Sequence, residues 1–299
     1  MLLFIIGAIV RPSFIAPNSV KSVLVVASFV GFVATGQAFV ILIGGIDLSV
    51  PWVLNASAIL LVTSSLGQDD RAIQAVLLCL GLGLLVGLIN GLGIVFLSVP
   101  AVVMTLGVNG IMQGLTLGLS KGFTCRSCSA NSPPVVSSAV GGNLLGIPAD
   151  LYIWFGIVLL VTFVLGFTSF GRKVYAVGNN TRASYLAGVN VNFVTVALYM
   201  LSGLFAAFTG IALVGYSGSP SLGIGDPYLF QSIAAVVIGG VSILGGRGNY
   251  LGVVAGSISL VALISVLQIM NIPDYGRSIL YGVVVILILL LYGREERET

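Results

Sequence analysis

The sequence predicts an all-α, polytopic membrane protein with about ten transmembrane helices, several of them short or broken. Hydrophobic residues make up 58% of the chain and charged residues only 7%, whereas soluble domains carry about 25% charged residues. A spanning helix needs about 20 mostly apolar residues, so a chain of this length accommodates roughly ten spans with short connections. We therefore expect residues 1–299 to form a single transmembrane domain.

Apolar runs separated by polar residues, glycine or proline predict the individual spans. The first run, residues 1–10, is too short to cross a bilayer, and it predicts either a half-helix or the inner part of a longer span. The other nine runs predict spans at residues 22–43, 51–66, 72–97, 101–118, 151–168, 193–216, 229–243, 250–270 and 278–292.

Two connections are longer than the rest, at residues 119–150 and 169–192. An even number of spans places both termini on the same side of the membrane. If that side is the cytoplasm, residues 169–192 form a cytoplasmic loop and residues 119–150 an external one. The twelve lysines and arginines divide evenly between the two sides, so the positive-inside rule does not decide the orientation. They are also scattered, which excludes a nucleic-acid-binding surface.

The cysteines of the predicted external loop, Cys125 and Cys128, are close enough in sequence to pair in an oxidising compartment. A disulfide and a pair of free thiols both remain open. The chain contains no histidine and three cysteines, which makes a four-ligand zinc site improbable, and we expect no bound metal or cofactor.

Enzyme signatures are incomplete. The stretch at residues 215–218 (GYSG) resembles the nucleophile motif of intramembrane serine proteases, but the chain has no histidine to act as the usual base. A phosphate-binding loop of the Gly-x4-Gly-Lys-Ser/Thr type is also absent from the sequence. We therefore expect that the chain is not an enzyme and does not hydrolyse ATP by itself.

The most informative short stretch is residues 44–49 (GGIDLS), where Gly44, Gly45 and an ionisable residue interrupt an apolar run. A carboxylate at membrane depth is costly unless it caps a helix or faces a polar cavity. Because Asp47 and Ser49 precede the helix that begins near Pro51, we expect capping. Direct handling of a substrate or proton and an interface contact are the alternatives.

A second glycine-rich break lies at residues 239–248, with Gly239, Gly240, Gly245 and Gly246. Transporters use interrupted helices to place backbone dipoles near a translocated ligand. We therefore interpret the two breaks as candidate gate elements.

Two glycine ladders have four-residue spacing. One lies in the fourth predicted span at residues 83, 87 and 91, and the other lies in and beyond the fifth at residues 110, 114, 118 and 122. This spacing places each set on one helix face. Close packing against a neighbouring helix is the expected role, and a dimer interface is the alternative.

Amide side chains within otherwise apolar spans predict a path for a neutral polyhydroxylated solute, which needs hydrogen-bond partners rather than fixed charge. Interhelical hydrogen bonding, worth about 0.6 kcal/mol each, is the competing interpretation. The candidate path residues are Gln37, Asn55, Asn90, Asn109, Gln113 and Gln231.

Four stretches together resemble the permease subunits of ribose-type ABC sugar importers, the branched ribose/xylose/galactose permease family. They are residues 44–49, 105–107 (TLG), 171–180 (GRKVYAVGNN) and 239–248, and the resemblance covers nearly the whole chain in the same order. Pro51 departs from the pattern, since the family more often has glycine there.

The resemblance implies a multi-pass protein of the bacterial inner membrane that imports a monosaccharide, with both termini in the cytoplasm. It also implies three kinds of partner: a cytoplasmic ABC ATPase that holds the ATP and magnesium, a periplasmic sugar-binding protein, and a second permease subunit in a homo- or heterodimer. An ATP-independent secondary transporter or channel is the alternative.

By the same resemblance, residues 179–188 form the coupling helix that contacts the ATPase. Polar contacts would come from Asn179, Asn180 and Arg182, an apolar anchor from Tyr185 and Leu186, and the end of the helix from Gly188. An ordinary solvated loop is the other interpretation of this segment.

Overall fold

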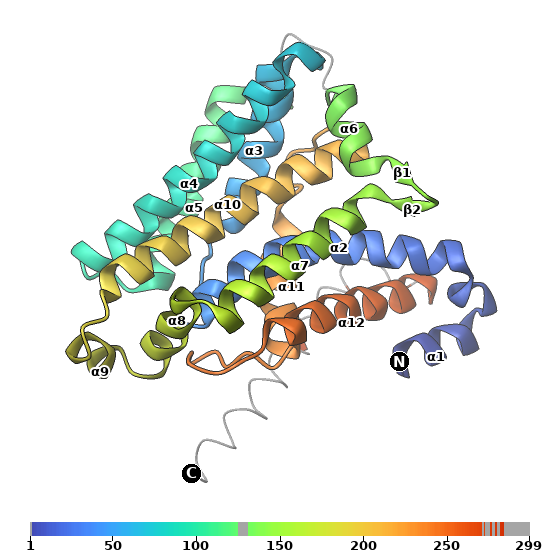
Figure 1. The fold of residues 1–299 in the computed structure, drawn as a ribbon. Coiled ribbons are helices and arrows are strands. Elements are labelled where there is room, and N and C mark those ends of the chain that lie inside the picture. Colours follow the sequence, from blue (N-terminus) through green and yellow to red (C-terminus); the bar gives the residue numbers. More distant parts are fainter. Residues whose placement is uncertain are drawn as a thin grey trace.

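The computed structural model describes residues 2–124 and 131–270, together with positions 272, 276, 279, 282 and 283. Within this part of the chain the structure is all-α apart from one short hairpin, which confirms the predicted fold class (Figure 1). Among the described residues, six helices are long and apolar enough to cross a membrane: α2 (Pro17–Ile41), α4 (Ala72–Phe96), α5 (Ala101–Ser120), α7 (Ala149–Phe167), α10 (Val191–Ser217) and α12 (Tyr250–Ile269). The predicted span at residues 278–292 falls outside the continuously described residues.

Shorter helices fill the remaining predicted spans and connections. The run at residues 1–10 forms the short helix α1 (Leu2–Val10), and two apolar helices, α3 (Val50–Ser65) and α11 (Asp226–Ile238), lie among the longer ones. The connections contain η1 (Pro12–Ile15), η2 (Asp69–Arg71), α6 (Pro134–Gly141), α8 (Ser169–Asn179) and α9 (Thr181–Leu186).

The two long connections both contain regular secondary structure. Residues 119–150 include α6 and an antiparallel hairpin of β1 (Asn143–Leu144) and β2 (Ile147–Pro148), and residues 169–192 form α8 and α9. Cys125 and Cys128 lie outside the described residues, so their pairing stays a prediction.

Helix α10 occupies the centre of the molecule and packs against α2, α3 and α4 (Figure 1). Its contact with α4 uses the first glycine ladder. A Cβ atom built on Gly83 or Gly87 would overlap the carbonyl oxygens of Gly203 or Tyr199, and one on Gly91 would lie 2.7 Å from the Cα atom of Val196. Only glycine permits this approach of two backbones, which confirms the predicted close packing for this ladder.

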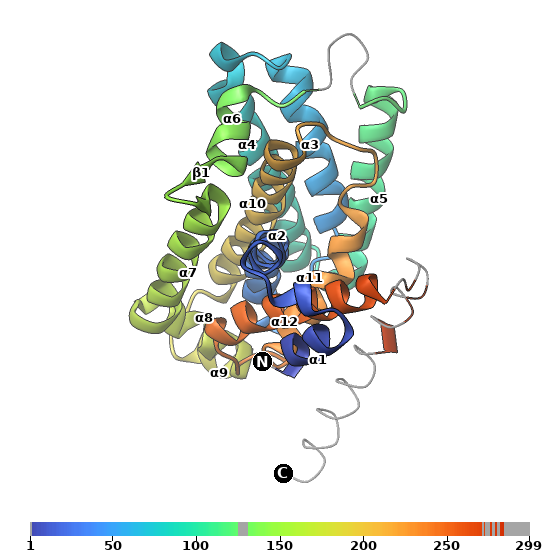
Figure 2. The same cartoon turned by 90° about the vertical axis from the view of Figure 1, so that its right-hand side faces the viewer.

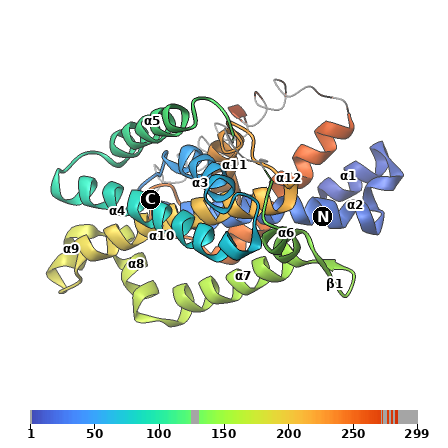
Figure 3. The ribbon, with the colours of Figure 1, turned by 90° about the horizontal axis from the view of Figure 1, so that it is seen from above.

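The second ladder behaves differently. A Cβ atom on Gly110, Gly114 or Gly118 of α5 would have no other atom within 4 Å in the part of the chain that the structure describes. The buried residues of α5, such as Thr105 and Val108, lie on another face, and the helix contacts α3 and α4 at the edge of the bundle (Figures 2 and 3). The expected packing against a neighbouring helix of this chain is therefore wrong for α5, and the dimer interface remains the open alternative.

The span predicted at residues 229–243 is also different in the structure. Helix α11 begins at Asp226, one residue before Pro227, and it ends before Gly239 and Gly240, the latter with a φ of +80°. Its 13 residues extend about 20 Å, which is less than the roughly 30 Å of a bilayer core. An irregular segment, residues 218–225, precedes it.

Candidate functional site

The two glycine-rich breaks contact each other through their backbones. The first joins α2 to α3 and the second joins α11 to α12. The amide of Gly246 donates a hydrogen bond of 2.8 Å to the carbonyl oxygen of Leu42. A Cβ atom on Gly245 would lie 2.7 Å from the nitrogen of Gly44, and one on Gly44 would lie 3.1 Å from the carbonyl oxygen of Leu244. The sequence predicted the two breaks separately, and the structure brings them together.

The end of α8 meets both breaks at the same point. A Cβ atom on Gly178 would overlap the carbonyl oxygen of Leu42 and lie 2.6 Å from the nitrogen of Gly246, while one on Gly246 would lie 2.7 Å from the Cα atom of Asn179. We call this meeting of Leu42, Gly44, Gly178, Gly245 and Gly246 the glycine junction. It holds three segments in contact with almost no side chain between them.

Tyr175 adds a side-chain link between α8 and the second break. Its hydroxyl donates a 3.0 Å hydrogen bond to the carbonyl oxygen of Gly248. Partial burial raises the pKa of Tyr175 above its ordinary value, so the hydroxyl keeps the proton that this bond requires.

Helix α9 follows directly from the glycine junction. The side chain of Asn180 caps it by accepting a 2.9 Å hydrogen bond from the amide of Ala183, and Gly188, with a φ of +83°, follows its end. Tyr185 and Leu186 are 71% and 78% exposed, and Arg182 beside them is exposed as well. Tyr185 and Leu186 therefore do not belong to this chain's core, and their role as an apolar anchor for the ATPase stays a prediction.

A buried polar cluster lies beside the first break. Oδ1 of Asp47 accepts hydrogen bonds from the amide and hydroxyl of Ser49, at 2.9 and 2.6 Å, and Oδ2 accepts a 2.7 Å bond from the hydroxyl of Ser202 on α10. The amide of Asn90 on α4 donates to the Ser49 hydroxyl at 2.9 Å. These four residues, the Asp47 network, connect the first break to α4 and α10. All four are at most 1% exposed.

The structure agrees with the expected capping only in part. Oδ1 of Asp47 accepts from the amide of Ser49, the residue at the N-terminal boundary of α3, but the side chain of Ser49 accepts no bond from the first turn. Pro51 removes one of the amides that a cap would use, and the other oxygen of the Asp47 carboxylate accepts from Ser202. Ser202 was missed at the sequence level because a single serine in an apolar span gives no distinctive signal.

The structure distributes the candidate path residues over several places. Gln37 is buried beside Asp47, with its amide placed to donate to the backbone oxygen of that residue at 3.2 Å and to accept from its nitrogen at 3.3 Å. Asn90 belongs to the Asp47 network. Asn55 is buried on α3. Their role as path residues stays a prediction.

The remaining three candidates lie on α5 and α11. Asn109 and Gln231 are half-buried and Gln113 is exposed. The second resembling stretch, residues 105–107, also reaches the first break, because Oγ1 of Thr105 lies 3.3 Å from the carbonyl oxygen of Ile46. Parts of all four resembling stretches therefore gather around residues 42–49.

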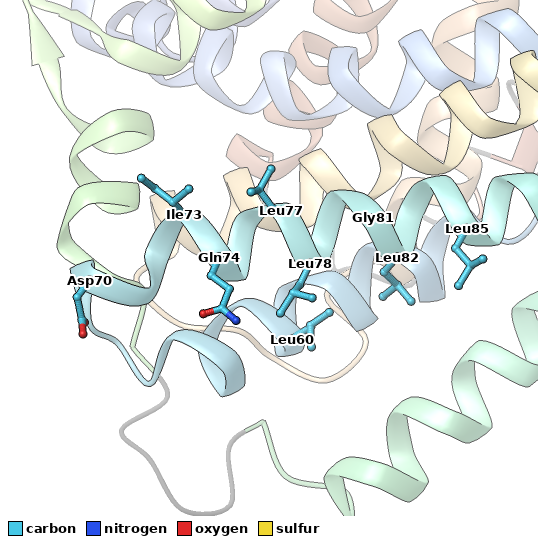
Figure 4. Close-up of a pocket in the computed structure, with 9 residues that line it drawn as sticks. All are labelled: Leu60, Asp70, Ile73, Gln74, Leu77, Leu78, Gly81, Leu82 and Leu85. Atoms are coloured by element: carbon cyan, nitrogen blue, oxygen red, sulfur yellow. The ribbon is translucent and has the colours of Figure 1, made fainter.

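A described groove lies elsewhere. It has a volume of about 780 Å³ and runs along the outer face of α4, with an apolar wall and Asp70 and Gln74 at one end (Figure 4). Of the candidate site residues, none lines it. Among the described residues there is also no cluster of three or more side chains suited to a metal ion.

Comparison with known proteins gives consistent matches over the whole chain. The family model described as "Branched-chain amino acid transport system / permease component" matches residues 19–289. The ribose import permease protein of Escherichia coli K12 is 30% identical over 296 residues, which covers 99% of this chain and 92% of the relative.

Two further relatives have similar coverage. The fructose import permease protein of Rhizobium meliloti is 33% identical over 94% of this chain and 79% of its own length. The autoinducer 2 import system permease protein of Escherichia coli O157:H7 is 30% identical over 98% of this chain and 84% of its own length. No solved structure matches the chain significantly.

Proposed function

The chain belongs to the permease-component family of ABC importers that its matched model and relatives define, and we propose that it carries a monosaccharide into the cytoplasm, driven by partner ATPase subunits. It is a multi-pass protein of the inner membrane. Two of the relatives named above import ribose and fructose, and both match nearly the whole chain, which supports a sugar as the solute.

The glycine junction is the observation that carries the proposed mechanism. It connects α9, whose Tyr185 and Leu186 are exposed, to the two helix breaks through backbone contacts at Gly178 and Gly246. Close-packed backbones do not compress, so a displacement of α9 passes to both breaks rather than being absorbed by side-chain rotation. The sequence lacks an ATP-binding loop of its own, and the energy therefore enters from a partner.

The transport cycle follows from this connection. An ABC ATPase that holds ATP and magnesium docks on α9, which places α9 and both termini in the cytoplasm. Closure of the ATPase moves α8 and α9, and the two breaks change the opening of a cavity between two permease subunits. A periplasmic sugar-binding protein delivers the solute at the α3–α4 end. This is alternating access, with the Asp47 network holding the first break against α4 and α10.

Reconstitution tests the proposal. Proteoliposomes that contain the chain together with its ATPase and binding protein are expected to accumulate radiolabelled ribose or fructose when ATP is supplied to the ATPase. Proteoliposomes with the chain alone are expected to accumulate neither sugar. Uptake by the chain without an ATPase would establish the secondary transporter or channel instead, and failure of the full complex to take up any monosaccharide would refute the sugar assignment.

A further inference from the structure

Residues 218–225 turn back along α3 without forming a helix. Helices α3 and α10 run in the same direction, since Asp47 contacts Ser202 and a Cβ atom on Gly210 would overlap the carbonyl oxygen of Leu54. Helix α10 continues seven residues beyond Gly210 to Ser217, which is about 10 Å.

The chain then returns to the start of α3, where a Cβ atom on Gly225 would overlap the carbonyl oxygen of Pro51. Measured along α3, the return covers about ten residues or about 15 Å, which is half of a bilayer core. In Figure 2 this segment is the orange loop that descends from the upper end of α10 to α11. An irregular segment therefore lies at membrane depth.

Several backbone groups of this segment have no hydrogen-bond partner in the part of the chain that the structure describes. Among the described residues, none forms a hydrogen bond with the amides of Ser219, Ser221 or Leu222 or with the carbonyl of Pro220. Non-helical backbone at membrane depth occurs only where it is buried in protein or lines a water-filled cavity. Ser219, Ser221 and Leu222 are exposed, so no described part of this chain buries them, and this favours the cavity.

The polar side chains of the same segment also favour a water-filled cavity. The hydroxyls of Ser219 and Ser221 and the carboxylate of Asp226, the first residue of α11, belong to exposed residues. A carboxylate that faced lipid at this depth would be costly. Asn55 holds the segment from the α3 side, with its amide placed to donate to the Ser221 oxygen at 3.3 Å and to accept from the Gly223 nitrogen at 3.0 Å.

We propose that residues 218–225, with Asp226, form this subunit's part of the wall of the aqueous route and contact the solute during passage. The inference rests on the proposed function and identifies the surface that the sugar meets. Hydroxyls, a carboxylate and free backbone amides offer both donors and acceptors to a neutral polyhydroxylated solute. Asn55 is a positioning residue, since it contacts the segment and not the route.

Thiol labelling tests the route directly. In a background with Cys79, Cys125 and Cys128 replaced by alanine, single variants Ser219→Cys and Ser221→Cys are treated in membrane vesicles with a charged, membrane-impermeant methanethiosulfonate added to both sides. Both thiols are expected to react at a rate within roughly tenfold of a water-exposed reference, because access controls thiol reactivity.

Two matched variants set the scale. Leu145→Cys, at a residue 99% exposed in the β1–β2 turn, is the aqueous reference, and Leu85→Cys, at an apolar residue 54% exposed on α4, is the lipid-facing reference. The proposal is overturned if both Ser219→Cys and Ser221→Cys react no faster than Leu85→Cys. Such protection would mean that lipid or a second subunit covers the segment.

The labelling needs neither sugar nor ATPase, so its failure is distinct from failure of the importer assignment. If the chain couples to its ATPase but neither thiol is labelled, the proposed route is refuted and the importer function stands. If the thiols are labelled but the chain transports sugar without an ATPase, the route stands and the importer function is refuted.

Discussion

Replacement of Gly178 by alanine perturbs the glycine junction at its tightest point. The new Cβ atom would lie 2.6 Å from the nitrogen of Gly246, whereas real Cβ atoms stay beyond 3.0 Å, and it would overlap the carbonyl oxygen of Leu42 more deeply. Both obstacles are backbone atoms, which cannot rotate away. The end of α8 must therefore separate from the two breaks.

We expect Gly178→Ala to lower the free energy of unfolding by about 1–3 kcal/mol, the usual cost of inserting a methyl group into a packed region. The matched control is Gly156→Ala on α7, where a Cβ atom would meet nothing within 4 Å among the described residues. Both glycines lie in helices, so alanine raises the helix propensity at both positions by a similar amount. The difference in stability between the two variants therefore reports mainly the steric overlap at Gly178.

Two measurements distinguish weakened coupling from weakened docking. Thermal unfolding in detergent measures the stability difference between the variants. Uptake into proteoliposomes measures ATP-driven sugar transport, and co-purification measures whether the ATPase still docks. The exposed face of α9 is unchanged, so Gly178→Ala is expected to retain the ATPase while uptake falls. If Gly178→Ala matches Gly156→Ala in both melting temperature and uptake, the junction does not transmit movement.

Three further predictions concern the surroundings of the junction. Asp47→Ala leaves the hydroxyls of Ser49 and Ser202 without their acceptor and is expected to lower the free energy of unfolding by about 2–5 kcal/mol, measured by thermal unfolding, with a smaller loss for Asp47→Asn. The double change Tyr185→Ala and Leu186→Ala removes exposed groups, so stability should change by less than about 0.5 kcal/mol while the ATPase no longer co-purifies. Asn55→Leu removes two contacts to residues 218–225 and is expected to cost about 1–3 kcal/mol in thermal unfolding.

Each of these has an outcome that contradicts it. Equal stability of Asp47→Ala and the unchanged chain would mean that the buried network contributes nothing. Undiminished ATPase recovery after the double change on α9 would remove α9 as the docking helix, and Lys173→Ala on the exposed side of α8 serves as its control. A melting temperature for Asn55→Leu equal to that of the unchanged chain would show that Asn55 does not hold the α10–α11 segment.

The sequence predicted the parts of the glycine junction but not their contact. Glycine breaks are local signals, so the segments around Gly44 and Gly245 were visible from composition alone. Their meeting with Gly178 depends on how α2, α8 and α11 pack, and residues 42, 178 and 246 are far apart in the chain. The family resemblance, confirmed by the match over residues 19–289, grouped the same stretches without indicating that they touch.

The two glycine ladders show where pattern reasoning stops. Both have four-residue spacing, yet Gly87 of α4 packs against α10 while Gly114 of α5 has no neighbour in the described chain. Spacing predicts that the residues share a face. It does not determine what that face meets, because this depends on the position of the helix in the bundle.

Helix α11 shows the same limit for apolar runs. Residues 229–243 are apolar enough to predict a span, but the backbone leaves the helix at Gly239 and Gly240. The apolar residue Val241, which continues the run, is buried outside any helix. Hydropathy predicts that a residue avoids water, but it does not predict whether its backbone is helical.

The near absence of side chains from the glycine junction separates two properties that evolution or engineering can alter. Under the proposed function, the side chains of α9 that recognise the ATPase, such as Arg182 and Tyr185, are exposed and can be exchanged. The proposed transmission depends instead on backbone atoms, which no exchange on α9 alters. Substitutions confined to the six-residue helix α9 could therefore adapt such a permease to a different ATPase without changing the two helix breaks.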